Sequence, residues 1–271
     1  MTSMLPEEGE YLTNGWEDDL PASDSLVRQG VLAHVSWARA LTTAARGAFA
    51  EGHGWCAGRG GGASALLNWA IVTSPPRSWA ATMGALSAAY PDDVSAIVIS
   101  PFPAPDLTAH GFELVGHPPL MFRPTSAADG APSTSVQVRQ ATTPQELQDA
   151  EHVLVEGYPM PDMAGLPPGD FYRPEVVDAS TRVFVGYLDG QPVATSAAHS
   201  AAGVTVVENV AVLGSARGRG AGAALTWAAT ATWPEQGAVL IASDDGQPVY
   251  ERLGFLRLER WTCWLRTESP T

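Results

Sequence analysis

The chain has 271 residues, which is enough for one large domain or two small ones. Hydrophobic residues make up 45% of it, so it can form a packed core. It carries 29 acidic against 15 basic residues, a net charge of −14. This balance argues against a nucleic-acid-binding protein, because such a protein needs a basic face.

Targeting signals and cysteine spacing further limit the class of protein. Residues 1–8 contain neither the basic nor the apolar segment of a secretory signal, and no apolar run reaches the roughly 18 residues needed to cross a membrane. Cys56 and Cys263 lie far apart and fit no metal-binding spacing. We therefore expect a cytoplasmic protein with free thiols, no metal and no membrane partner.

In the first half, the glycine-rich segment at residues 60–62 is either a phosphate-binding loop or a turn before a strand. Further along, residues 124–135 are rich in Pro, Ser and Ala, which is typical of a linker. We therefore divide the chain into a first domain at residues 1–124, a linker at 125–135 and a second domain at 136–271.

The two sides of this linker share residues at matching positions, 141 to 143 residues apart. The matches are Gly62 and Asn68 with Gly203 and Asn209, Gly111-Phe112 with Gly254-Phe255, and Met121-Phe122-Arg123 with Trp264-Leu265-Arg266. They suggest a tandem duplication. The position of Gly60-Gly61-Gly62 within this repeat favours a hairpin turn.

The second half has clear local signals. Thr143-Pro144-Gln145-Glu146 is a capping box that starts a helix, and Asp189-Gly190 is a two-residue hairpin signal. Residues 158–173 contain four prolines and are expected to form a loop. The predicted order is strand (136–140), helix, loop, strands (183–188, 192–199 and 204–212), helix (223–233), strand (238–243), short helix (249–253) and two strands. This order predicts a mixed sheet with helices on both faces.

The most informative stretch follows the strand at 204–212. Its sequence, Arg217-Gly218-Arg219-Gly220-Ala221-Gly222, leads from a strand into a helix, where free backbone N–H groups and the helix dipole favour a phosphate. Gly218, Gly220 and Ala223 also fit the dinucleotide-binding pattern G-x-G-x-x-A, and a simple Gly/Ala-rich turn is a third interpretation. Only about fifty residues follow, too few for the remaining strand–helix units of a dinucleotide-binding domain.

Three segments together resemble the GNAT superfamily of acyl-CoA-dependent N-acyltransferases. The loop at 217–222 fits the family pattern Arg/Gln-x-x-Gly-x-Gly/Ala, residues 248–255 (Pro-Val-Tyr-Glu-Arg-Leu-Gly-Phe) are similar to the second signature, and residues 208–212 to the central strand. The resemblance covers roughly residues 135–266. It implies an α/β fold of two tandem GNAT-like domains, each a mostly antiparallel twisted sheet flanked by helices.

The first half departs from this pattern where the second has its glycine loop. It carries Ser74-Pro75-Pro76-Arg77-Ser78-Trp79, in which proline supplies no N–H donor and Trp79 is bulky where backbone must approach a phosphate. At the position of Tyr250 it has Asp106 or Leu107. We therefore expect the first domain to be a degenerate GNAT fold that binds no cofactor.

The resemblance also implies a cofactor site for acetyl-CoA or another acyl-CoA. Pantetheine and the thioester carbonyl would lie along the strand Val210-Ala211-Val212. The pyrophosphate would bind the N–H groups of the loop, namely Arg217, Gly218, Arg219, Gly220, Ala221 and Gly222. Ser243 either bonds to the cofactor or caps the following helix.

The catalytic candidates are Tyr250 and Glu208. Tyr250 stands where family members place the acid that protonates the thiolate, although a core tyrosine is the alternative. Glu208 is either a base or water-linked carboxylate, or a polar residue on the other sheet face. Asn209 is one residue along the strand, so only one of the two is expected to face the reaction centre.

We place the acceptor pocket under the loop at 158–172, with Tyr158, Asp162, Phe171 and Asn209 as candidate contacts and the first domain as a possible wall. The expected function is transfer of an acyl group, most simply acetyl, to a primary amine of a small molecule by a monomer or homodimer. Two alternatives remain open: a non-catalytic acyl-CoA-binding sensor or scaffold, and a dinucleotide-dependent oxidoreductase.

Overall fold

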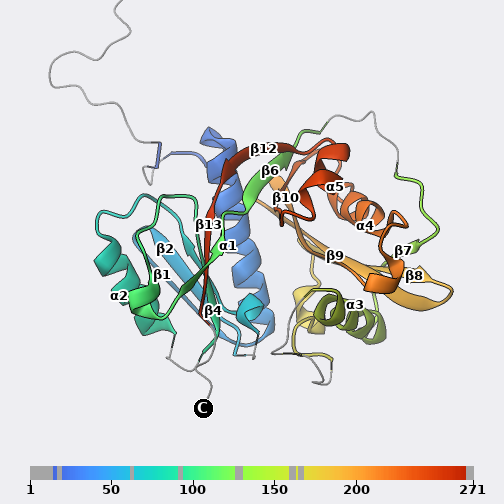
Figure 1. Cartoon of the computed structure of the whole chain (residues 1–271), viewed down its shortest axis with the longest axis horizontal. Coiled ribbons are helices and arrows are strands. Elements are labelled where there is room, and N and C mark those ends of the chain that lie inside the picture. The colour runs from blue at the N-terminus through green and yellow to red at the C-terminus, as the bar shows by residue number, and fades with distance from the viewer. Residues whose placement is uncertain are drawn as a thin grey trace, which may run out of the picture.

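The computed structural model describes residues 15–16, 20–61, 64–90, 94–125, 131–158, 163 and 168–266. They form two lobes, each built around one β-sheet, with a long helix between them (Figure 1). The elements of the first half are α1 (Leu26–Ala44), β1 (Ala48–Gly52), β2 (Trp55–Arg59), β3 (Trp69–Val72), α2 (Trp79–Ala89), β4 (Ala96–Ser100), β5 (Glu113–Gly116) and β6 (Pro119–Arg123).

The second half has the predicted order of elements. They are β7 (Gln137–Gln140), α3 (Pro144–Gly157), β8 (Thr181–Leu188), β9 (Gln191–Ala201), β10 (Val204–Val212), α4 (Ala221–Thr230), β11 (Gly237–Ile241), α5 (Gln247–Arg252), β12 (Leu256–Arg260) and β13 (Thr262–Arg266). Apart from β7, each element from α3 onward has a counterpart in the first half, although a short 3-10 turn at Thr108–His110 stands in place of α5.

The local signals act where the sequence predicted them. Thr143 Oγ1 accepts the N–H of Glu146, and Glu146 Oε2 accepts the N–H of Thr143, so the capping box is complete. Asp189 and Gly190 have φ of +51° and +77° and join β8 to β9. Gly60 and Gly61 lie in the connection between the antiparallel strands β2 and β3, whereas Gly62 lies outside the described residues.

The two sheets have the same strand order when they are traced from opposite edges. The first is β1-β2-β3-β4-β13-β5 and the second is β12-β6-β11-β10-β9-β8-β7, with β7 as an added edge strand. In each, the described strands contain one parallel pair, β3 with β4 and β10 with β11, and the other pairs are antiparallel. This is the mixed, mostly antiparallel fold that the sequence predicted, and it differs from the parallel sheet of a dinucleotide-binding domain.

The halves exchange one strand each, which the sequence analysis did not foresee. β6 belongs to the first half but lies between β11 and β12 of the second sheet. β13 belongs to the second half but lies between β4 and β5 of the first sheet. A division of the chain at residues 124–136 therefore follows the sequence repeat, while each sheet contains one strand from the other side of that division.

The repeated arginines hold the exchanged strands in place. Arg123, at the end of β6, donates from Nε to the carbonyl of Leu253 at 2.7 Å. Arg266, at the end of β13, donates to the carbonyls of Tyr90 and Val94, each at 3.3 Å. Each arginine is buried and binds a carbonyl of the half that receives its strand. The two repeated arginines therefore have the same structural role.

Helix α1 lies between the two sheets and is buried against both (Figure 1). Its residues Val31 and Val35 pack with β-strand residues of both sheets, and Trp37 and Leu41 pack with α3. A helix between two sheets needs apolar residues on more than one face, which explains its many buried positions. None of the helices in the described part of the chain is both long enough and apolar enough to cross a membrane.

Candidate functional site

A bulge interrupts β10 where the sequence placed Glu208 and Asn209. The pairing of β10 with β9 shifts by one residue between Glu208 and Ala211, and Asn209 has φ of +53°. Asn209 Nδ2 donates to the hydroxyl of Tyr172 at 3.0 Å, and Glu208 also lies near that hydroxyl. The expectation that the two residues face opposite sides is therefore wrong, because the bulge breaks the alternation of side chains on which it rested.

Beyond the bulge, β10 and β11 separate. Their pairing runs from Val204 opposite Gly237 to Val206 opposite Val239, although β10 continues to Val212. The segment Val210–Val212 therefore has β9 on one side and no strand on the other. This segment therefore has backbone groups without a strand partner on that side, where the carbonyl of Val212 accepts from Arg217 Nε at 3.4 Å.

The glycine loop has the backbone conformation of an anion site. Gly218 and Gly220 have φ of +75° and +78°, which glycine adopts without strain, and Gly220 is the N-cap of α4. No side chain caps this helix, and its first bond to the N-cap is donated by Ala224. The N–H groups of Ala221 and Gly222 therefore point out of the helix end, where the dipole favours negative charge.

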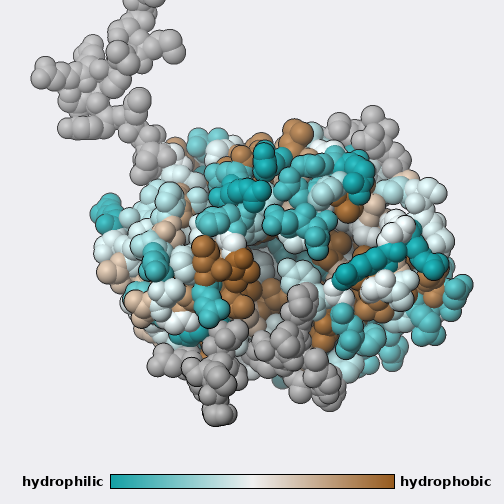
Figure 2. Space-filling model, viewed as in Figure 1, coloured by the Kyte–Doolittle hydropathy of each residue, from teal (hydrophilic) through white to brown (hydrophobic). Residues whose placement is uncertain are grey.

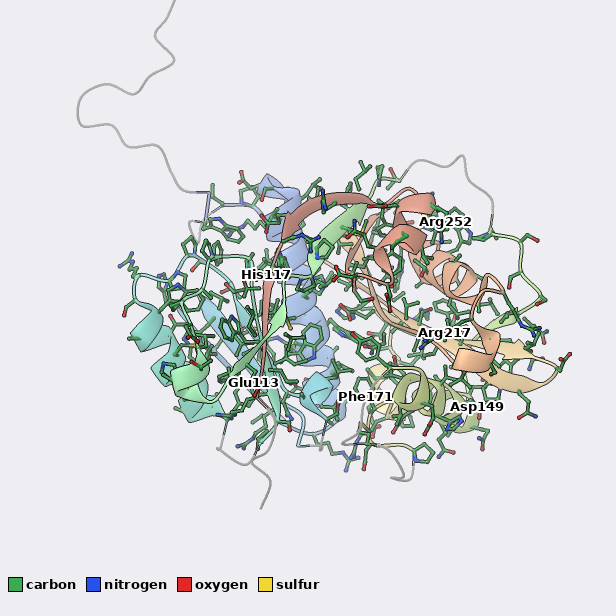
Figure 3. The ribbon with its side chains drawn as sticks, viewed as in Figure 1. Glu113, His117, Asp149, Phe171, Arg217 and Arg252 are labelled. Carbon is green, nitrogen blue, oxygen red and sulfur yellow. The ribbon has the colours of Figure 1, made fainter. Side chains whose placement is uncertain are left out.

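The two arginines of the loop are placed differently. Arg217 folds back over the open strand and donates to the carbonyls of Val212 and Gly157, each at 3.4 Å. Arg219 is exposed, and its carbonyl accepts a hydrogen bond from Thr134 Oγ1 at 3.1 Å. Arg217 thus lies beside the separated strands and the loop at once, where its positive charge favours a bound anion (Figure 3).

Glu208 influences the pKa of two tyrosines of the predicted site. Burial, then Tyr158, then Glu208 raise the pKa of Tyr250, which is 9% exposed. Burial, followed by Glu208 and Cys263, also raises the pKa of Tyr158, although that residue exposes 40% of its surface. Both phenols are therefore protonated near neutral pH.

The other predicted contacts lie as follows. Ser243 Oγ accepts the N–H of Gly246 at 3.1 Å, so in this structure it closes the turn that leads into α5. Phe171 is 2% exposed and packs edge-on against Tyr172, with ring centroids 5.0 Å apart, in the core beneath α3. Asp162 lies outside the described residues.

The first half supplies a residue that the sequence analysis missed. His34 of α1 is fully buried, and its Nε2 lies 3.2 Å from Glu208 Oε1. The ring of Trp261 packs against that of His34 with centroids 5.4 Å apart. No motif marks His34, and its position near Glu208 depends on α1 packing against β10, so no local sequence signal could have found it.

The viewed face of the molecule is hollowed between the two lobes. Figure 2 shows a hollow near the centre of the viewed face, between the two lobes. Glu113 begins β5 and His117 follows its last residue, Gly116, at the edge of the first lobe (Figure 3). Leu114 and Val115 of this edge strand are 47% and 61% exposed, and Leu114 is paired with Trp264 of β13.

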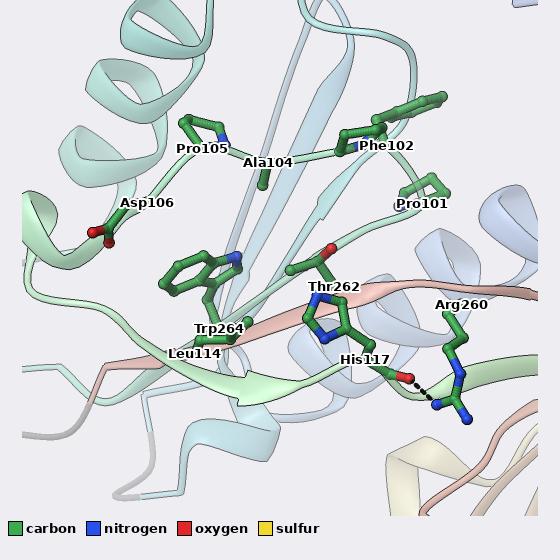
Figure 4. Close-up of a pocket in the computed structure, with 11 residues that line it drawn as sticks. Pro101, Phe102, Ala104, Pro105, Asp106, Leu114, His117, Arg260, Thr262 and Trp264 are labelled. Atoms are coloured by element: carbon green, nitrogen blue, oxygen red, sulfur yellow. Dashed lines mark hydrogen bonds between the residues drawn. The ribbon is translucent and has the colours of Figure 1, made fainter.

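A separate pocket of about 390 Å³ lies on the first sheet. Its lining includes Thr262 and Trp264 of β13, the segment Pro101–Asp106, His117 and Arg260, which donates to the carbonyl of His117 (Figure 4). Side chains alternate along a strand, so Trp261 and Cys263 face the other way, toward His34 and Tyr158. β13 therefore separates this pocket from the candidate site.

Metal chemistry has no support in this arrangement of side chains. Within the described ranges, no three His, Cys, Asp or Glu residues are grouped so that they could hold a metal ion. The groups that converge are one carboxylate, one imidazole and three phenols, from Glu208, His34, Tyr158, Tyr172 and Tyr250. Such a set suits proton transfer.

Comparison with known proteins agrees with this geometry. A family model described as an acetyltransferase (GNAT) domain matches residues 179–257, which include the bulge, the glycine loop and Tyr250. Comparison with curated proteins gives no match. Residues 179–257 are thus similar to a GNAT acetyltransferase domain, and the two sheets are consistent with a tandem arrangement.

Solved structures extend the likeness in fold to most of the chain. A GCN5-related N-acetyltransferase from Kribbella flavida matches with a TM-score of 0.61 and 24% identity over 86% of this chain and 95% of that one. A functionally unknown conserved protein from Staphylococcus epidermidis matches with a TM-score of 0.56 and 16% identity, over 76% and 87%. A GCN5-related N-acetyltransferase from Sphaerobacter thermophilus gives 0.51 and 16%, over 80% and 78%.

Proposed function

We propose that this protein, with its GNAT domain in the second half, transfers an acyl group from coenzyme A to the primary amine of a small molecule. The acyl donor in this proposal is acetyl-CoA, and the first half binds no cofactor. The observation that carries the proposal is the separation of β10 from β11 beside an uncapped, glycine-rich helix start. An extended ligand with a phosphate at one end fits that arrangement.

In the proposed complex, the pantetheine lies along Val210–Val212 and pairs with the open side of the strand. The pyrophosphate binds the N–H groups between Gly218 and Gly222, with Arg217 supplying positive charge. The thioester is then placed near the bulge, where Glu208, Asn209 and Tyr250 meet. The support for this placement is the continuous path from the free strand backbone to the free helix end.

In the proposed chemistry, Glu208 accepts a proton from the acceptor amine and Tyr250 donates a proton to the leaving thiolate. Glu208 takes a proton from the ammonium form of the acceptor, directly or through one water, so that the amine nitrogen can attack the thioester carbonyl. Backbone N–H groups at the bulge stabilise the oxyanion. The C–S bond then breaks, and Tyr250 gives its proton to the leaving thiolate. The products are the amide and free coenzyme A.

The acceptor in this proposal binds in the opening between the lobes. Tyr158 exposes 40% of its surface, and Glu208 contributes to raising its pKa. An amine with an apolar body matches a carboxylate near aromatic side chains.

Cofactor binding is tested by calorimetry with acetyl-CoA and a matched pair of variants. Gly218 and Gly61 have nearly the same φ, +75° and +77°, and a Cβ at either would meet no atom within 4 Å. Asp tolerates this conformation, so Gly218→Asp and Gly61→Asp carry similar strain. Gly218→Asp places a carboxylate against the pyrophosphate and should weaken binding roughly tenfold or more, whereas Gly61→Asp should not. Equal affinity in both variants, or no binding by the unmodified protein, would contradict the proposal.

Turnover is tested separately, by following free thiol released from acetyl-CoA in the presence of a panel of small amines. Release that depends on the amine supports an enzyme. Binding of acetyl-CoA without release for any amine in a broad panel would instead favour a non-catalytic acyl-CoA-binding protein.

A further inference from the structure

His34 stands out because its partner is the proposed catalytic carboxylate while its helix belongs to the first half. Its Nε2 lies 3.2 Å from Glu208 Oε1. Neither atom has a hydrogen-bond partner elsewhere in the part of the chain that the structure describes. The imidazole is fully buried and the Glu208 side chain is 10% exposed, so water does not substitute for this contact at the histidine.

The other ring nitrogen fixes the protonation of His34. Nδ1 lies 2.6 Å from the carbonyl oxygen of Gly30, one turn earlier in α1. A carbonyl only accepts hydrogen bonds, so Nδ1 carries a hydrogen. A neutral ring would then present the lone pair of Nε2 to a carboxylate oxygen, which is repulsive. A second proton must lie between Nε2 and Oε1.

The surroundings favour that proton on the histidine. The Gly30 carbonyl and the Glu208 carboxylate both accept from the ring, and hydrogen bonds of this kind stabilise the imidazolium. The titratable groups near the pair are the phenols of Tyr158, Tyr172 and Tyr250, which remain neutral, and His199. With the second proton on the ring, His34 and Glu208 form an ion pair across the 3.2 Å between Nε2 and Oε1.

We propose that His34 is a positioning residue for the reaction, supplied to the GNAT site by the otherwise degenerate first half. Its N–H holds Oε1 of Glu208, which leaves Oε2 for the acceptor amine, and its charge keeps the carboxylate ionised. The proton removed from the amine goes to Oε2 and then to solvent, while the His34 proton stays in place. This inference rests on the proposed function, because it assigns His34 a part in acyl transfer.

The charge state is tested first, without reference to activity, by NMR of protein labelled with ¹⁵N in its histidines. His34→Gln identifies the His34 signals by their loss. We expect both His34 nitrogens to carry protons near neutral pH, and only Nδ1 to do so in Glu208→Gln. A neutral His34 ring in the unmodified protein would overturn the proposal even if the enzyme is fully active.

The catalytic part is tested by pH profiles of kcat/KM for the unmodified protein, His34→Gln and His34→Leu. Removal of a cation makes the neighbouring carboxylate harder to ionise, so the acidic limb should move to higher pH by about one unit in both variants. Gln keeps an N–H donor, so it should recover part of the kcat that Leu loses. The KM for acetyl-CoA should change little, since the polar contacts of His34 in the described structure are to Glu208 and to the carbonyl of Gly30.

His199→Gln is the matched control, because His199 is another buried histidine of the same interface and bonds to Ser36 and Thr181 instead of Glu208. It should leave the acidic limb in place. An unshifted limb in both His34 variants, with activity intact, would overturn the proposal and leave the acyltransferase function standing. Absence of amine-dependent turnover in the unmodified protein would overturn the role in catalysis together with the proposed function, while the NMR result would still decide the ion pair.

Discussion

The two halves share one strand order but differ at the point where a cofactor would bind. In the second half, β10 carries a bulge, separates from β11 after Val206 and leads to a helix without a side-chain cap. In the first half, β3 and β4 remain paired through Ile71 opposite Ile99, and Ser78 Oγ caps α2 by accepting the N–H of Ala81. The two halves have the same strand order, and a bulge and a missing side-chain cap are the differences that leave backbone groups unpaired in the second half.

This difference assigns separate roles to the halves. In the proposed function, the second half presents backbone groups to the cofactor, whereas Ser78 caps the equivalent helix in the first half. The first half still reaches the site through His34. The following four changes test how far the separation of roles holds, from the largest expected effect to the smallest.

Tyr250→Phe should lower kcat about 100-fold or more and leave acetyl-CoA affinity nearly unchanged, because it removes only the proposed proton donor to the thiolate. The measurement combines steady-state thiol release with calorimetry. Tyr90→Phe is the control in the first half, where the hydroxyl donates to the carbonyl of Gly58 and is also buried. Similar kcat in Tyr250→Phe and the unmodified protein would remove Tyr250 from the mechanism.

The interface between the halves should weaken in acid through His199. This histidine bonds to Ser36 of α1 and Thr181 of β8, and burial lowers its pKa to about 4, with Asp178 opposing and His34 reinforcing the shift. Its pKa in the unfolded chain is higher, so the unfolded state takes up a proton first. The stabilising contribution, up to about 3 kcal/mol, is complete above pH 6.5 and is lost as the pH falls toward 4.

Denaturant unfolding at pH 7, 5.5 and 4.5 measures this loss, with His199→Gln as the comparison. The variant cannot titrate at this position, so its stability should fall less over the same range. Parallel losses in the two proteins would show that other groups govern the acid response.

Arg123→Met and Arg266→Met should each destabilise the protein by about 2 kcal/mol, because each removes charged hydrogen bonds to buried carbonyls. The two variants are compared because the arginines are equivalent: each one holds a strand of its own half in the sheet of the other half. Urea unfolding should show similar changes in the free energy of unfolding. A large loss for one arginine alone would show that the two exchanged strands are not equally important.

Ser78→Ala should cost about 1 kcal/mol of stability by leaving the start of α2 uncapped, and should not affect acetyl-CoA binding. Thermal unfolding and calorimetry measure the two effects. A gain of cofactor binding at the first half, detected as a second site, would show that the cap alone keeps that half closed.

The features that the sequence predicted correctly are those that depend on a few consecutive residues. The capping box at Thr143, the Asp189-Gly190 hairpin and the glycines of the loop act through their own backbone geometry, and the structure has each of them. The bulge was not predicted because Asn209, and not a glycine, occupies the left-handed conformation there. A glycine at this position would have indicated a bulge in the sequence.

The strand exchange and His34 depend on contacts between distant segments. Residues 121–123 and 264–266 look alike in the sequence, so either strand could in principle fill either sheet, and only packing of the whole chain selects between them. His34 becomes a neighbour of Glu208 because α1 lies against β10, some 170 residues later in the chain.

The exchanged strands have a consequence for the independence of the two halves. β6 and β13 are interior strands of the sheets that receive them, so removal of either half would leave the remaining sheet with a gap between two strands. Neither half can therefore be deleted from the chain without opening the sheet of the other.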